Sequence, residues 1–149
     1  MLKSVLAVIV GYLAMAIFLF AAFTGVYLAL GTERTFQPDT YVVSGLWLAL
    51  AAIVSFCGAI VGGFVCAAIS KNKRTCQVLA AIVFILGIAV CIPAMREDPT
   101  PRPRTGDVPN LQAMQQAQTP VWMHILSPFI GAIGVLLGAR MKLCSTTVP

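Results

Sequence analysis

Four long apolar runs, separated by shorter polar connections, dominate the sequence. They cover about residues 4–30, 43–70, 75–94 and 121–141. A helix needs about 20 predominantly apolar residues to cross about 30 Å of hydrocarbon, and each run reaches or nearly reaches that length. The first two runs are long enough to tilt or to project past the bilayer. We therefore predict an all-α membrane protein in which residues 1–149 form a single bundle of four transmembrane helices.

Composition agrees with this pattern. The chain of 149 residues is 59% hydrophobic and 10% charged, with a mean hydropathy of +0.91, whereas a soluble domain is about 25% charged. The first run follows Lys3, as the apolar core of a signal peptide would, but it continues to Leu30. That is well beyond the usual signal-peptide core of about 7–15 residues. We expect this run to remain as an uncleaved first helix.

The charged residues divide between the two ends of the runs. All five acidic residues lie in the connections after the first and third runs: Glu33, Asp39, Glu97, Asp98 and Asp107. Six basic residues lie at the opposite ends: Lys3, Lys71, Lys73, Arg74, Arg140 and Lys142. The remaining four lie on the acidic side: Arg34, Arg96, Arg102 and Arg104. Since cytoplasmic segments have the excess of Lys and Arg, this six-to-four division predicts that the N and C termini are both cytoplasmic.

Aromatic residues and the net charge fit this orientation. Residues that favour the membrane–water interface lie near the predicted outer boundary: Tyr27, Tyr41, Trp47 and Trp122. The net charge of +5 comes from residues at membrane edges, where they set topology and can contact anionic lipid. We therefore expect the lipid bilayer, and no nucleic acid, as a partner. The expected location is a bacterial inner (plasma) membrane, with the chain crossing it several times.

The two halves of the chain resemble each other at an offset of 73 residues. Residues 5–10 match residues 78–83, and residues 56–60 match residues 129–133 in the same register. A duplication would make two tandem helical hairpins related by an axis along the membrane normal. Chance is an equally good explanation, because apolar segments use few residue types.

Small residues form rows that predict close packing of helices. In lipid, close contact between backbones must supply much of the drive for helix association. The second run has two such rows: Ala51, Ser55, Ala59, Gly63 and Ala67, and beside it Gly58, Gly62, Cys66 and Ser70. We expect the second and fourth helices to form the central pair, with packing positions at Gly58, Gly62, Gly131, Gly134 and Gly138. The seam is either intramolecular or part of a homodimer; we favour the first, because a four-helix chain has its own faces to bury.

The connection of residues 95–120 differs in kind from the other two. Residues 98–109 contain four prolines, which predicts an extended, polyproline-like extracytoplasmic loop. Residues 110–118 predict a short interfacial helix, and we expect Val108, Leu111 and Met114, at spacing three, to rest on the outer membrane surface. A loop of this length suits either partner docking or an unstructured connector. The first connection, residues 31–40, is too short to form a site alone.

No constellation of residues points to catalysis, a cofactor or a metal. His124 is the only histidine, whereas haem held by two histidines needs a second one. The cysteines include no CxxC pair of the kind that thiol oxidoreductases use: Cys57, Cys66, Cys76, Cys91 and Cys144. Proton-coupled exporters of similar size use a membrane-embedded carboxylate, and no acidic residue lies within the runs. We therefore assign no catalytic, cofactor-binding or metal residue.

Two functions fit these expectations. The first is a structural or accessory component of a larger membrane complex. The second is an oligomeric pore or facilitative carrier for a neutral or apolar solute, with polar contacts from Tyr12, Thr24, Tyr27, Ser44, Ser55, Ser127 and His124. We favour the first because the runs offer small-residue faces for packing and no charged group in their central spans for ion coupling.

Overall fold

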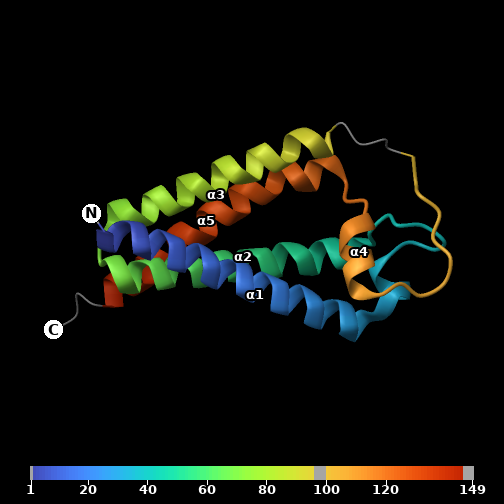
Figure 1. Ribbon diagram of the computed structural model, residues 1–149, viewed down its shortest axis with the longest axis horizontal. Helices are drawn as coiled ribbons and strands as arrows, with labels where there is room; N and C mark the ends of the chain where they lie inside the picture. The colour runs from blue at the N-terminus through green and yellow to red at the C-terminus, as the bar shows by residue number, and fades with distance from the viewer. Residues whose placement is uncertain (1, 96–99, 146–149) are drawn as a thin grey trace.

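The computed structural model describes residues 2–95 and 100–145 (Figure 1). Within them the chain forms five helices: α1 Leu2–Thr35, α2 Gly45–Ser70, α3 Lys73–Ala94, α4 Asn110–Gln116 and α5 Val121–Ser145. All of these except α4 are long and apolar enough to cross a membrane. The prediction of an all-α chain with four helices suited to membrane spanning is confirmed. Three residues that entered the prediction of orientation lie outside the described residues: Arg96, Glu97 and Asp98.

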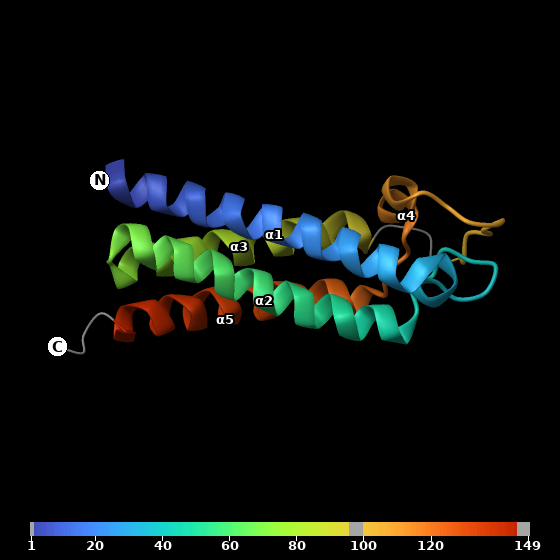
Figure 2. The same cartoon turned by 90° about the horizontal axis from the view of Figure 1, so that it is seen from below.

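The four long helices run side by side, and the chain enters and leaves at the same end (Figures 1 and 2). That end contains the start of α1, the α2–α3 turn and the end of α5, and we call it the basic end. The opposite end contains α4 and both longer connections, and we call it the loop end. α2 packs between α1 and α5, while α5 packs between α2 and α3. The pair α2–α5 therefore joins the α1–α2 hairpin to the α3–α5 hairpin.

Local sequence explains where the central helices begin and end. The Ser44 hydroxyl accepts a hydrogen bond from the Trp47 N–H at 3.2 Å and so caps α2. At the other end Lys71 adopts a left-handed conformation, with φ 49°, and its N–H donates to the Ala67 carbonyl. Asn72 then caps α3 by accepting from the Arg74 N–H at 3.0 Å. The two helices are thus joined by a tight turn of two residues.

α1 is longer than the sequence pattern predicts. It continues to Thr35, but Gly31 has φ 71° and ψ 173°, so the helix breaks there and its last turn takes a new direction. A positive φ of this size favours glycine, which has no Cβ to clash with the backbone. The predicted end at Leu30 therefore coincides with the kink, and the extra turn belongs to the loop end.

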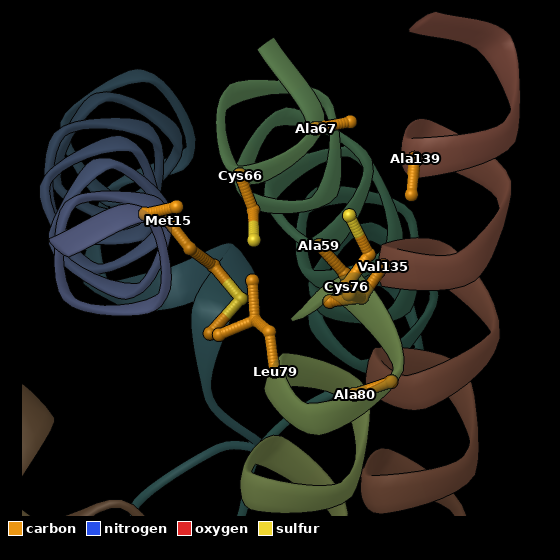
Figure 3. Packing of buried hydrophobic residues seen from close by; sticks show 10 residues of the cluster. Met15, Ala59, Cys66, Ala67, Cys76, Leu79, Ala80, Val135 and Ala139 are labelled. Atoms are coloured by element: carbon orange, nitrogen blue, oxygen red, sulfur yellow. The ribbon is translucent and has the colours of Figure 1, made fainter. Parts of the chain in front are cut away.

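Small side chains fill the space between the helices (Figure 3). The main core cluster comprises Ala7, Met15, Ala59, Cys66, Ala67, Cys76, Leu79, Ala80, Val135 and Ala139. Most larger apolar side chains instead face outward, among them Ile17, Ile85 and Val90. Helices with small inward residues can approach closely, and this contact replaces the hydrophobic drive that lipid removes.

Candidate functional site: the glycine contacts and the loop-end cap

Glycines bring the backbones of α2 and α5 into direct contact. A Cβ added at Gly63 would overlap the Val135 carbonyl oxygen, and one added at Gly138 would overlap the Ile60 carbonyl oxygen. Next to them on the loop side, a Cβ at Gly134 would lie 2.6 Å from the Ala59 Cβ. These contacts involve backbone or the first side-chain carbon, so no rotamer change could make room. The predicted contact between the second and fourth helices is therefore present, with Gly63 as its α2 glycine.

The other two α2 glycines face a different helix from the one expected. A Cβ at Gly58 would lie 2.7 Å from Leu19 Cδ2, and one at Gly62 would lie 3.0 Å from the Gly11 carbonyl oxygen. Both neighbours belong to α1. The GxxxG pair Gly58/Gly62 thus packs on α1, and the adjacent row through Gly63 packs on α5. Our assignment of that pair to the α2–α5 contact was wrong, because small residues occupy more than one face of α2.

A third contact joins α3 to α5. A Cβ added at Gly131 would lie 3.0 Å from Val83 Cγ1, and one added at Gly87 would lie 2.8 Å from Pro128 Cγ. The Pro128 ring is buried and packs against the notch that Gly87 leaves on α3. Gly11 and Gly87 are packing positions that the rows did not identify.

Gly25 lies inside a span but packs against no neighbouring helix in the described part of the chain. A Cβ built on it meets nothing within 4 Å. Ala21 and Ala29, one turn away on either side, and Leu28 on the same face are also exposed. We call these four residues of α1 the outer patch. It combines small residues and one large apolar side chain on a face that no described residue covers.

The connections at the loop end fold together into a cap. Its apolar centre comprises Tyr27, Phe36, Tyr41, Val43, Val108 and Ala113. Backbone bonds cross between the first connection and residues 102–118: the Tyr41 N–H donates to Arg102 at 3.1 Å, and the Gln118 N–H donates to Tyr41 at 2.8 Å. The Arg104 N–H also donates to the Asp39 carbonyl at 2.8 Å. The first connection therefore folds jointly with the third.

Arg104 is the buried cation of this cap. Its side chain is 3% exposed and lies 3.4 Å from Glu33 Oε1, while that carboxylate is 81% exposed. Its Nη1 donates to the Gly106 carbonyl at 2.6 Å, and its guanidinium lies 6.0 Å from the Phe36 ring centre. Its Nε has no partner among the described residues. The guanidinium therefore links three segments: the end of α1, the turn that follows it and the proline-rich loop.

Tyr27 and Asn110 fasten the cap to α1. The Tyr27 hydroxyl donates to the Val108 carbonyl at 2.6 Å, and the Asn110 side-chain amide donates to the Thr24 hydroxyl at 3.1 Å. The short helix α4 follows at once, where the sequence predicts one. Val108 is buried in the cap, whereas Leu111 and Met114 are 65% and 44% exposed. The expectation that all three rest on the membrane surface was therefore wrong for Val108.

Of the polar residues proposed for a solute path, three are bonded at the loop end and two are exposed. Thr24 and Tyr27 bond to the cap, and Ser44 caps α2 and donates to the Arg34 carbonyl. Tyr12 and Ser127 are exposed on the outside of the bundle.

At the loop-side end of α5, the His124 carbonyl accepts a hydrogen bond from the Cys91 thiol at 2.9 Å. Cys57 and Cys144 are exposed, while Cys66 and Cys76 are buried. Among the described residues, no group of three or more His, Cys, Asp or Glu side chains could hold a metal ion. Comparison with protein-family models, curated proteins and solved structures finds no match.

Proposed function

We propose that this chain is a non-catalytic structural or accessory subunit of a larger membrane complex and that its outer patch docks a partner polypeptide. The observation that supports this most directly is the open face around Gly25. Every glycine in the interior of the other three spans, and Gly11 of α1, has a neighbouring helix within about van der Waals distance of an added Cβ. Gly25 has none. A glycine flanked by alanines at spacing four is the type of surface that another helix can approach closely.

The level of Leu28 in the outer patch also favours a protein over lipid as its cover. α3 has 22 residues, or about 33 Å, at a rise of about 1.5 Å per residue. That matches a hydrocarbon core of about 30 Å. α1 begins level with α3, since Ser4 and Thr75 line one cleft, but it runs about 45 Å before its kink at Gly31. Leu28 lies in the part of α1 that extends beyond the length of α3, and its side chain is 71% exposed.

Orientation and origin belong to the same proposal. We place the basic end in the cytoplasm of a bacterial inner membrane, with the cap outside. Of the arginines on the loop side, Arg104 is bonded within the cap, so it has a structural role there.

The chain forms two helical hairpins. Gly58 and Gly131, which correspond at the offset of 73, each face the preceding span of their own hairpin. This correspondence supports a duplication.

Photocrosslinking in the native host tests the docking proposal. A benzophenone amino acid replaces Leu28 in the outer patch or, as the matched control, Ile85 on the exposed face of α3. These two side chains are 71% and 65% exposed. We expect a protein adduct from position 28 and only lipid adducts from position 85. Only lipid adducts at both positions would refute the proposal.

A steric variant identifies the surface independently. Gly25→Leu adds a large side chain where nothing lies within 4 Å, so the isolated chain should keep its stability while losing its partner on gentle extraction. Ala81→Leu, on an exposed position of α3, is the control and should keep the partner. Native mass spectrometry of both extracts measures the assembly. A homo-oligomer that conducts solutes in liposomes would instead support the pore or carrier alternative.

A further inference from the structure

A cleft at the basic end separates the first turns of α3 from the last turns of α5. Its volume is about 630 Å³. Two cations line it, Lys73 from α3 and Arg140 from α5, together with the polar side chain of Gln77. Both cations are exposed, and they come from different helices. The cleft therefore presents two positive charges at the level where a bilayer has its headgroups.

The remaining lining of the cleft is apolar. Leu136, Leu143 and Cys144 line it on the α5 side. The buried residues Cys76 and Ala139, which Figure 3 shows in the core between the helices, also line it. Leu136 lies one helical turn deeper in the span than Arg140. A ligand that fits this lining has a negative group at the rim and an apolar chain below it.

No described carboxylate offsets the charge of this cleft. Glu33, Asp39 and Asp107 belong to the loop-end connections, at the opposite end of the molecule (Figure 1). Three more basic residues lie at or beside the α2–α3 turn and α1: Lys71, Arg74 and Lys3. Arg74 lines a second cleft, between α1 and α3, in which it is the one charged residue. The α3–α5 cleft, with two cations, therefore attracts an anion more strongly than the α1–α3 cleft, which has one.

We propose that the α3–α5 cleft is a binding site for one anionic phospholipid, with Lys73 and Arg140 on its phosphate and an acyl chain along Leu136. Basic pockets between membrane helices recognise anionic headgroups, and each Lys or Arg near the surface adds attraction. A guanidinium on one side and an ammonium on the other suit a phosphodiester oxygen pair. A zwitterionic lipid adds an ammonium group that two cations would repel.

The test is a lipid titration of the purified full chain, read by native mass spectrometry. Phosphatidylglycerol is the anionic probe and phosphatidylcholine the neutral one. We expect one tightly held phosphatidylglycerol per chain and weak, unsaturated binding of phosphatidylcholine. Lys73→Gln with Arg140→Gln should weaken the phosphatidylglycerol adduct about thirtyfold, at about 1 kcal/mol per cation. The control Lys3→Gln with Lys71→Gln removes the same charge outside the cleft and should change binding about twofold or less.

Three results would overturn the proposal. Equal losses in the two double variants would show attraction to general surface charge. Equal affinity for the two lipids would show that charge does not select the ligand. Complete displacement by millimolar glycerol 3-phosphate would show an anion site that does not need the acyl chain. Lys73→Arg with Arg140→Lys keeps both charges and should retain the adduct, which separates loss of a site from loss of folding.

Discussion

Replacing Gly63 with alanine should destabilise the α2–α5 contact. The added Cβ would overlap the Val135 carbonyl oxygen, so relief requires the helix axes to separate. Separation also loosens the contacts at Gly134 and Gly138 on the same seam. Overpacking of this kind costs about 1–3 kcal/mol.

Gly25→Ala is the matched control, because it makes the same chemical change where nothing lies within 4 Å. Alanine is favoured over glycine inside a helix by about 1 kcal/mol, and this term applies to both variants. The difference between them therefore isolates the steric cost. We expect Gly25→Ala to be neutral or slightly stabilising, and Gly63→Ala to be less stable than it by about 1–3 kcal/mol.

Unfolding of the purified chain in mixed micelles by increasing mole fraction of sodium dodecyl sulfate, followed by circular dichroism, measures both variants. Equal midpoints for the two would refute the conclusion that backbone contact at Gly63 stabilises the bundle. A lower midpoint for Gly25→Ala than for Gly63→Ala would do so as well.

Three further predictions concern the cap, the α3–α5 contact and the orientation. Arg104→Ala removes the buried guanidinium and should destabilise the cap by about 1–3 kcal/mol, whereas Glu33→Gln removes an exposed partner and should cost about 1 kcal/mol or less; limited proteolysis within residues 100–118 compares them, and equal protection would contradict the role of Arg104. Gly131→Ala should destabilise by bringing a Cβ to 3.0 Å from Val83 Cγ1, and Val83→Ala should restore part of the loss, so additive effects in the double-mutant cycle would be inconsistent with direct contact. A fluorescent protein fused to the C terminus should fold in the cytoplasm and an alkaline phosphatase fused there should be inactive; the reverse pattern would invert the proposed topology.

The spans and their order were predictable because bilayer thickness imposes a length and a composition on each helix. Their ends were less so. The capping of α2 by Ser44 and of α3 by Asn72 is local chemistry that the sequence contains, yet the apolar runs alone placed those ends two residues away. The sequence showed only that an apolar run ends before Gly31. It did not show that the helix continues to Thr35 after a kink, because that last turn depends on contacts with the cap.

The pairing of helix faces was harder to predict, because it depends on rotation about the helix axis. Adjacent positions such as Gly62 and Gly63 point about 100° apart at 3.6 residues per turn, and one contacts α1 while the other contacts α5. Both rows of small residues were recognised, but nothing local distinguishes their partners. The Arg104–Glu33 pair was beyond prediction for another reason: its members are 71 residues apart in the sequence, with the two spans α2 and α3 between them.

The cap also has a consequence for the order in which the chain matures during synthesis. Its first half, including Tyr41 and Val43, is made with the α1–α2 hairpin, but its backbone partners Arg102 and Gln118 emerge only after α3 has been made. Until then the apolar side chains of the first connection lack their final neighbours. The cap can therefore form only if the second hairpin is inserted in the same direction as the first. An inverted hairpin would leave residues 102–118 on the opposite side of the membrane.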